Sequence, residues 1–577
     1  MRSIINKSLI AAAVFSLPAC SDFTELNVNP NQLGADKINS KYILTSALSF
    51  SANNYIREYT YGYTSEHGIS EAMQYMQRDY IGYEINSFVW RPVGFTTMRS
   101  VTDSQTLLQN SASEPDEELK KFYSGVASVI RAFWFGFYTS AWGDIPYSQA
   151  VQGQDLQFKP VYDTQKEVFK GIIQELKTAN DLLEGLGTVS AIGSADILYG
   201  GNAVKWRKLA NSLRIRYYLR LSEKKDELKG ENFDIVAELK EILANPVKYP
   251  VFEGNADNAA VKLPGTDAFN SWIGGPLANS NRSQFYRRKP CSTIIDFLKN
   301  TSDPRLTAWF RPVDVQLKVG SSSEGYVRNN SGQILRYIPQ YQNGLDTSRY
   351  VGLKPALGDP TIYNLGATAS YSKIGALNNT LYLDQGANPH VSYLADMYAQ
   401  NTAPLVKAVL MSYAELSFLL AEASLKGWIG ENAAQYYRKG IEGSLDQYEI
   451  ASGNKSVYNT KNHDLVAFDR AAFLSGMDNE FTNNPDRQHE LLMSQKWVAL
   501  WMTPEFWFDW RRTGLPSFSE NVVEGSNGNK IPVRLIYGSR EYIVNESNVR
   551  AAVNKLQPAE DTQWSGMWLL QGTSQPW

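Results

Sequence analysis

Three long stretches of the chain carry apolar residues at intervals of three or four, and this spacing constrains the fold more than any other feature of the sequence. The apolar positions are Leu119, Phe122, Val126, Val129, Phe133 and Phe137 in the first stretch, Val168, Ile172, Leu176, Ala179 and Leu183 in the second, and Trp206, Leu209, Leu213, Tyr217 and Leu221 in the third. Because residues three and four apart share one face of an α-helix, each stretch predicts an amphipathic helix packed against other helices. Strands do not alternate with helices of similar size, which disfavours a doubly wound sheet. We therefore expect a mostly α fold.

A helical hairpin is predicted over residues 413–448, where two helical patterns flank the sequence GWIG at 427–430. Leu420-Ala421, Ala433, Tyr437 and Gly440 follow the spacing of small and aromatic residues in a tetratricopeptide repeat. The other helix pairs do not repeat at a period of about 34 residues. We infer degenerate repeats with insertions, and an unrelated helical hairpin is the alternative.

Residues 251–401 differ from the helical stretches because they are rich in Gly, Pro, Asn, Ser and Tyr and contain only short apolar runs. We expect irregular structure there, between the helices. So long an insertion is uncommon in a compact body unless it builds a functional surface. The sequence therefore predicts one domain over 36–577, with a loop-rich, ligand-binding insertion at about 251–401.

The first twenty residues have the pattern of a secretory signal, with Arg2 and Lys7 before an apolar stretch that is too short to span a bilayer. The sequence LPAC at 17–20 resembles the lipobox of bacterial lipoproteins. This predicts a signal peptide at 1–19, lipidation of Cys20 and a tether at 20–35. An ordinary signal peptide is the alternative. The other cysteine, Cys291, then has no partner, and we expect it to be a packed residue rather than a nucleophile.

Composition excludes several function classes. The 56 Lys and Arg against 59 Asp and Glu give a formal charge of −3, so we expect no nucleic-acid partner. Two cysteines and four histidines are too few for a structural zinc site, and we expect no metal or cofactor. No nucleophile elbow, phosphate loop, dinucleotide fingerprint or zinc-protease motif is present, so no catalytic residue is predicted. A glycosidase stays open, because it needs only two carboxylates about 5 to 10 Å apart.

Motifs distributed along the whole chain resemble those of the SusD/RagB family of outer-membrane nutrient-binding lipoproteins, in particular its SusD-like branch. They are ELNVNPN at 25–31, AWGDIPYSQA at 141–150, WRKLANSLR at 206–214, DPRL at 303–306, YAE at 413–415, LLAEA at 419–423, WFDWRRTG at 507–514 and IPVRLIYGSRE at 531–541. Each motif is short, and their common order over the chain carries the resemblance. It implies a scaffold of helix pairs similar to tetratricopeptide repeats, with a variable insertion that holds the ligand. It also implies no enzymatic activity and a position over a SusC-like TonB-dependent barrel.

Two of these motifs are interpreted as structural. Gly143 and Pro146 stand where the first amphipathic helix must end, because glycine permits a left-handed cap and proline blocks continuation. The aromatic cluster from Trp497 to Trp510 predicts core packing. We expect Arg511 and Arg512, which follow it, to pair with carboxylates rather than with a ligand.

Sugar recognition requires flat aromatic faces together with amide or guanidinium groups on loops. The best candidate is the segment 270–282 with the residues that follow it. The predicted ligand-binding residues are Trp272, Asn279, Arg282 and Tyr286 in this segment, and Tyr83 and Trp90 in a second cluster. A packing role is the alternative for each of them.

The function we expect is that of a surface-exposed outer-membrane lipoprotein that captures an oligosaccharide and delivers it to a SusC-like TonB-dependent transporter. The preference for a glycan rests on the family resemblance. An oligopeptide ligand, a site shared with the barrel and a surface glycosidase are the alternatives.

Overall fold

The protein is described by a computed structural model. The described residues are 39–60, 62, 67–78, 88–95, 98–153, 156–313, 316, 326–328, 334–337, 348–356, 391–518 and 530–573. The predicted signal peptide, Cys20, the tether at 20–35 and Tyr83 lie outside them. Within them the structure is mostly helical, as the apolar spacing predicted, and none of these helices is long and apolar enough to cross a membrane.

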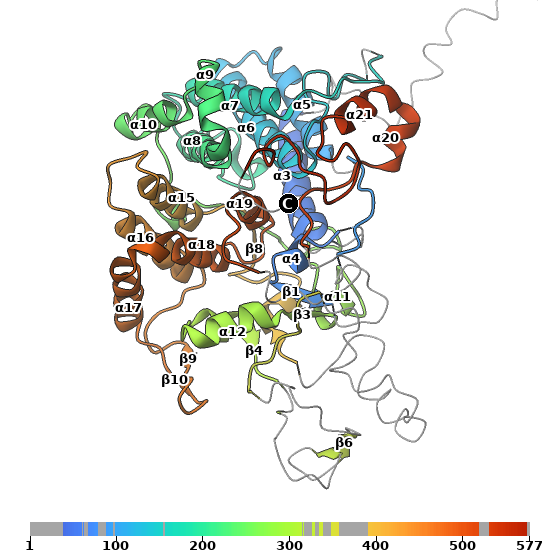
Figure 1. The fold of residues 1–577 in the computed structure, drawn as a ribbon. Helices are drawn as coiled ribbons and strands as arrows, with labels where there is room; N and C mark the ends of the chain where they lie inside the picture. Colours follow the sequence, from blue (N-terminus) through green and yellow to red (C-terminus); the bar gives the residue numbers. More distant parts are fainter. Residues whose placement is uncertain are drawn as a thin grey trace, which may run out of the picture.

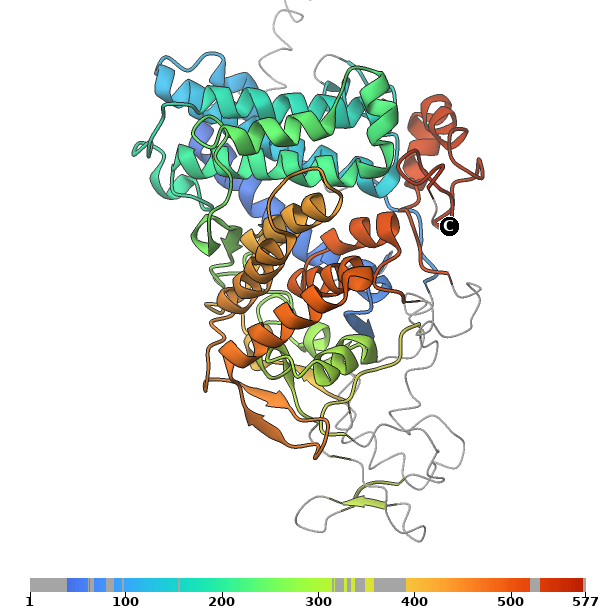
Figure 2. The ribbon, with the colours of Figure 1, turned by 60° about the vertical axis from the view of Figure 1, so that its left-hand side comes forward.

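The N-terminal half forms a layer of helices, with α6, α7 and α8 side by side (Figures 1 and 2). The elements are α3 (Ser40–Asn54), α4 (Ile69–Ala72), α5 (Arg99–Ser111), α6 (Glu117–Trp142), α7 (Gln165–Leu182), α8 (Ala203–Arg220), α9 (Lys225–Gly230) and α10 (Ile235–Ala244). The three predicted amphipathic helices are α6, α7 and α8, and their apolar faces are buried.

Helix α6 ends at Gly143 for the reason that the sequence indicated. Gly143 has φ of 102°, which L side chains rarely adopt, and a Cβ there would lie 3.2 Å from Met567. The next residue, Asp144, accepts a hydrogen bond at 2.8 Å from the backbone N–H of Gln165 and pairs with Lys555 at 2.8 Å. This motif therefore joins the end of α6 to the start of α7, which confirms its structural role.

The second helical group contains the predicted hairpin, which is formed by α15 (Tyr413–Leu425) and α16 (Ala433–Gln447). The two helices approach closely at Gly440, where a Cβ would lie 2.6 Å from the ring of Phe418. This close approach explains why a glycine stands at this position of the hairpin. The remaining helices of the group are α17 (Arg470–Asn483), α18 (Gln488–Ala499) and α19 (Glu505–Thr513), and α20 (Ser539–Val544) and α21 (Glu546–Val553) follow at the edge of the molecule (Figure 1).

The described strands are short and form five antiparallel pairs, most of which involve the insertion. The pairs are β2 (Ala259–Lys262) with β8 (Lys407–Met411), β4 (Phe310–Arg311) with β7 (Tyr393–Leu394), β1 (Met76–Arg78) with β3 (Arg288–Pro290), β5 (Tyr326–Arg328) with β6 (Ile334–Tyr337), and β9 (Ser456–Tyr458) with β10 (Leu465–Ala467). The described part of the insertion is more regular than expected, because it also contains α11 (Ser283–Tyr286), α12 (Ser292–Asn300) and α13 (Arg305–Trp309).

Buried ion pairs connect α8 with α15 and α19. Arg216 on α8 contacts Glu415 on α15 at 2.6 and 2.7 Å and Glu505 on α19 at 3.4 Å. Arg220, one turn further along α8, also pairs with Glu505. All four side chains are at most 5% exposed. Breaking one member of such a cluster leaves an unpaired charge in the interior, so these residues hold the helices in one arrangement.

The two arginines after the aromatic cluster behave differently from each other. Arg512 pairs with Glu422 at 2.8 Å and with Asp509 at 3.1 Å, as expected. Arg511 contradicts the expectation, because it donates its hydrogen bonds to backbone carbonyls, one of them Ser140 at 2.6 Å, and its guanidinium lies 4.2 Å from the ring centre of Trp507. The cluster itself is buried, as predicted.

Cys291 is fully buried, and burial raises the pKa of its thiol to about 12. The thiolate, which is the reactive form, is therefore strongly disfavoured. This agrees with the expected packing role.

Candidate functional site

The segment that carries most of the predicted ligand-binding residues, 270–287, packs closely on residues 396–402. The backbone N–H of Trp272 donates to the carbonyl of Asn401 at 2.8 Å. A Cβ on Gly274 would lie 2.3 Å from the carbonyl oxygen of Tyr398. Glycine is therefore required here by the close approach of two backbones. Gly274 in this candidate loop therefore serves the packing of two backbones against each other.

Trp272 does not offer the open stacking face that the sequence predicted. Its side chain is 1% exposed, and its ring lies 5.8 Å from the ring of Tyr398. The hydroxyl of Tyr398 in turn accepts a hydrogen bond from Trp501 Nε1 at 2.9 Å. The indole of Trp272 is thus part of an aromatic core beneath the surface.

Trp90 is also closed off from solvent, with 4% of its surface exposed. Its ring meets those of Trp507 at 5.5 Å and His67 at 6.1 Å, edge to face. The geometry gives Trp90 a packing role, and its predicted partner Tyr83 lies outside the described residues. Ligand binding by either tryptophan stays a prediction.

Asn279, Arg282 and Tyr286 are partly exposed and lie together at α11, and we call this group the α11 surface. Arg282 has φ of 55°, which turns the chain into α11, and its guanidinium carbon lies 5.3 Å from the ring centre of Tyr286. Asn279 Oδ1 accepts hydrogen bonds from Ser283 Oγ at 3.1 Å and from the N–H of Gln284 at 3.3 Å. The three predicted residues are thus brought together and held by local contacts.

Buried aromatic and basic residues support the α11 surface from below. The ring of Tyr393 is 4% exposed and meets Tyr286 edge to face at 6.3 Å. Lys289 Nζ lies 3.2 Å from the centre of the Tyr393 ring. Arg288 pairs with the buried Glu71 at 2.6 Å. This packing fixes the position of the Tyr286 ring.

The chemistry of the α11 surface suits binding better than catalysis. Residues 271–290 contain neither Asp nor Glu, so this stretch cannot supply the pair of carboxylates that glycoside hydrolysis needs. Arg282 is partly exposed, and its guanidinium lies beside the Tyr286 ring. A guanidinium beside an aromatic ring can bind a ligand that has hydroxyl groups and an apolar face.

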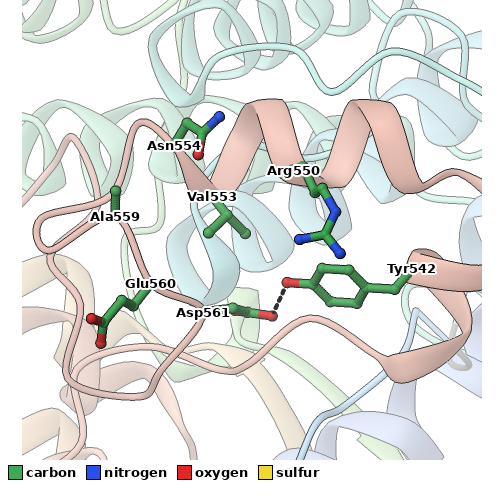
Figure 3. Close-up of a pocket in the computed structure, with 7 residues that line it drawn as sticks. All are labelled: Tyr542, Arg550, Val553, Asn554, Ala559, Glu560 and Asp561. Carbon is green, nitrogen blue, oxygen red and sulfur yellow. Dashed lines mark hydrogen bonds between the residues drawn. The ribbon is translucent and has the colours of Figure 1, made fainter.

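A concave site, which the sequence did not indicate, lies at α20 and α21 (Figure 3). A cavity of about 360 Å³ is lined by Tyr542, Arg550, Val553, Asn554, Ala559, Glu560 and Asp561. The guanidinium of Arg550 lies 5.7 Å from the ring centre of Tyr542, and the Tyr542 hydroxyl donates to Asp561 Oδ2 at 2.7 Å. Burial, followed by this bond to Asp561, raises the pKa of Tyr542 above its usual value. No sequence signal joins these residues, because the loop at 559–561 meets the helices only in the folded chain.

Among the described residues, no group of three or more His, Cys, Asp and Glu side chains could hold a metal ion.

Comparison with known proteins identifies the class of protein to which this fold belongs. A SusD-like family described as "Starch-binding associating with outer membrane" matches residues 30–348 and 355–538. The chain belongs to this family. The structural motifs described above, including Glu415, Glu422 and Arg512, lie within the matched residues. The SusD-like resemblance read from the sequence is therefore confirmed.

Solved structures show the same fold. A SusD homolog from Bacteroides fragilis NCTC 9343 is 21% identical, with a TM-score of 0.68, and the match covers 91% of this chain and 100% of that one. A SusD homolog from Bacteroides uniformis ATCC 8492 is 22% identical, with a TM-score of 0.63 and coverage of 92% and 99%. A chitin-binding protein is 21% identical, with a TM-score of 0.65 and coverage of 92% and 99%. No curated protein matches the chain significantly.

Proposed function

We propose that the protein captures an extracellular oligosaccharide at the cell surface and delivers it to a SusC-like TonB-dependent transporter in the outer membrane. The observation that carries this proposal is the family match over most of the chain, since that family is described as starch-binding and associating with the outer membrane. Similarity to a chitin-binding protein favours a glycan over an oligopeptide. The protein acts without changing its ligand.

Attachment to the membrane is through lipid on Cys20, after removal of residues 1–19. The lipobox-like sequence at 17–20 supports this attachment. Intact-mass measurement of the protein from the membrane fraction should give a chain that begins at Cys20 and carries acyl groups. An unlipidated mature chain would contradict the anchor.

The ligand contacts the α11 surface. The Tyr286 ring supplies a face for the C–H groups of a sugar, and Arg282 and Asn279 supply polar groups for its hydroxyls. Because this surface is already ordered by its own contacts, little side-chain freedom is lost on binding.

An exposed apolar patch suits contact with the transporter. The patch consists of Leu156, Phe158, Val161, Ile543 and Val544, which are 41 to 82% exposed. Its two segments are held together because Asn545 Nδ2 donates to the carbonyl of Pro160 at 2.7 Å. Exposed apolar groups clustered in this way mark interaction surfaces, whereas single exposed apolar residues are ordinary.

Replacement of apolar patch residues tests this contact. Phe158→Asp and Ile543→Asp should abolish co-purification of a TonB-dependent barrel, identified by mass spectrometry, from outer membranes. Val247→Asp is the matched control, since Val247 is 88% exposed but lies outside the patch. Unchanged co-purification in both patch variants would assign the contact to another face.

Native affinity electrophoresis tests glycan capture. The chain from Ser21 onwards is run through gels that contain different polysaccharides, and retardation by at least one polymer is the expected result. Absence of retardation on a broad panel would contradict capture of a glycan by this protein alone and would favour an oligopeptide or a site shared with the barrel. Prolonged incubation should leave the size of the retarding polymer unchanged, and shortening of the polymer would identify a glycosidase.

A further inference from the structure

The cavity at α20 and α21 has polar groups that the fold leaves unused. Asp561 is not one of them, because Oδ2 accepts from Tyr542 and Oδ1 accepts from Arg534 Nη1 at 2.6 Å. Arg550 uses its Nε to bind Glu546 at 2.8 Å. The two Nη groups of Arg550 and the side chains of Asn554 and Glu560 form no hydrogen bond with the part of the chain that the structure describes.

These polar groups line the same cavity as two apolar surfaces, the Tyr542 ring and the Val553 side chain. The Tyr542 ring is fixed by its bond to Asp561, and the Val553 side chain points into the space between the helix and the loop (Figure 3). Arg550 and Asn554 supply donors, and Glu560 and Asn554 supply acceptors. Donors and acceptors beside a flat apolar face are what one polyhydroxylated ring requires.

Charge and size narrow the class of ligand. Arg550 is paired with Glu546, and Asp561 with Arg534, so Glu560 is the charge without a partner in the described structure, and an anionic ligand would be repelled. The volume of about 360 Å³ lies at the lower end of the roughly 300 to 1,000 Å³ of small-molecule sites. The cavity therefore suits one ring rather than a chain of several.

We infer that this cavity is a second carbohydrate site, which binds a single neutral sugar residue. This inference rests on the proposed glycan function and adds a site to it. Helix α21 lies well away from α11 (Figure 1). A bound polysaccharide is thus held at two separate points, and two linked contacts bind more tightly than either contact alone.

Saturation-transfer NMR on the full mature chain tests the second site. The probes are methyl glycosides of glucose, galactose, mannose and N-acetylglucosamine, with glucuronic acid as the anionic comparison. We expect transfer to at least one neutral glycoside and none to glucuronic acid. Arg550→Ala and Glu560→Gln should each reduce the signal by about fivefold or more, since each removes a hydrogen bond to a charged group.

Two further variants make the result specific to the cavity. Arg487→Ala removes an exposed arginine that is paired with Glu490 at 3.1 Å, much as Arg550 is paired with Glu546, and it should leave the signal unchanged. Tyr286→Ala removes the stacking ring of the α11 surface, so the cavity variants are also compared in this background, where the remaining transfer comes from the cavity.

The inference of a second site is contradicted if no neutral glycoside gives transfer, or if the signal is as strong in Arg550→Ala and Glu560→Gln as in the wild type. Retardation of the wild-type protein in polysaccharide gels would show, in that case, that only the second site has failed. A signal lost in Tyr286→Ala but retained in the cavity variants would place all sugar binding at the α11 surface.

Discussion

Arginine is used in opposite ways in the helical scaffold and at the α11 surface. Arg216 and Arg220 on α8 and Arg512 on α19 are buried, and each is paired with a carboxylate from another helix. Arg282 at the α11 surface is partly exposed, lies against aromatic rings and has no carboxylate partner in the described structure. The nearby sequence, 271–290, contains no acid that could pair with it.

This difference separates the charged residues that stabilise the fold from those that are available to bind a ligand. The shared motifs of the scaffold contain many charged residues, but they neutralise one another and fix the packing of helices. At the α11 surface, by contrast, the partly exposed Arg282 lies beside an aromatic ring without a carboxylate partner in the described structure, so its guanidinium is available to a ligand. Scaffold variants should therefore change stability, whereas variants of the α11 surface should change affinity.

The largest expected effect is on stability, in Glu415→Ala. The substitution leaves Arg216 buried, and among the described residues its one remaining carboxylate partner is Glu505 at 3.4 Å. Loss of one member of a buried ion pair costs about 3 to 5 kcal/mol of the free energy of unfolding. Chemical denaturation measures this change. Glu490→Ala is the control, because its pair with Arg487 is exposed and should contribute at most about 1 kcal/mol.

Acid should destabilise the scaffold through His67. Burial, followed by repulsion from Arg78, lowers the pKa of His67 from 6.5 to about 3. Below pH 6.5 the unfolded chain binds a proton that the folded chain does not. The stability contributed by neutral His67 is thus complete above pH 6.5 and is lost as the pH falls towards 3, by at most about 1.4 kcal/mol per pH unit.

Denaturation curves at several pH values measure this loss. His67→Phe should flatten the dependence of the unfolding free energy on pH between about 6 and 4, relative to the wild type. His463→Phe, which replaces an exposed histidine, should not flatten it. An equal slope in the wild type and His67→Phe would show that His67 is not the group responsible.

A smaller effect, on affinity alone, is expected for Tyr286→Ala. Loss of one stacking ring should weaken polysaccharide binding by about tenfold, corresponding to roughly 1.4 kcal/mol. Tyr436→Ala is a matched control, since Tyr436 is also partly buried and also has a cation, Lys439, 5.3 Å from its ring centre. If Tyr286→Ala and Tyr436→Ala have equal affinities in affinity gels, Tyr286 does not contact the ligand.

The smallest effect is expected for Arg282→Lys, which keeps the charge but loses the planar set of donors. Affinity should fall by about threefold, with no change in the midpoint of thermal unfolding. Isothermal titration with an oligomer of the retarding polysaccharide measures the change. A loss of stability with unchanged affinity would show that Arg282 stabilises the fold, as the scaffold arginines do, and would contradict its role in ligand binding.

The helices were predictable because their signal is local. The apolar spacing gave α6, α7 and α8, and Gly143 marked the end of α6, where its positive φ is required. The hairpin of α15 and α16 followed from small residues such as Gly440, which faces the ring of Phe418. In each case the pattern that predicts the element lies within one short stretch of the sequence.

The site was less predictable because it depends on contacts between distant segments. The burial of Trp272 comes from Tyr398, 126 residues later in the chain, and no local pattern indicates it. Arg511 donates to the carbonyl of Ser140, although a carboxylate partner was expected for it. The cavity at α21 requires the meeting of Tyr542 and Asp561 in the fold.

The most direct test of the central claim is hydrogen–deuterium exchange of the mature chain with and without an oligomer of the polysaccharide that retards it. The account predicts slower exchange in peptides that cover 277–290 when the oligomer is bound, and no change in peptides from α15. Protection of α15 without protection of 277–290 would place the ligand on the scaffold and contradict the account.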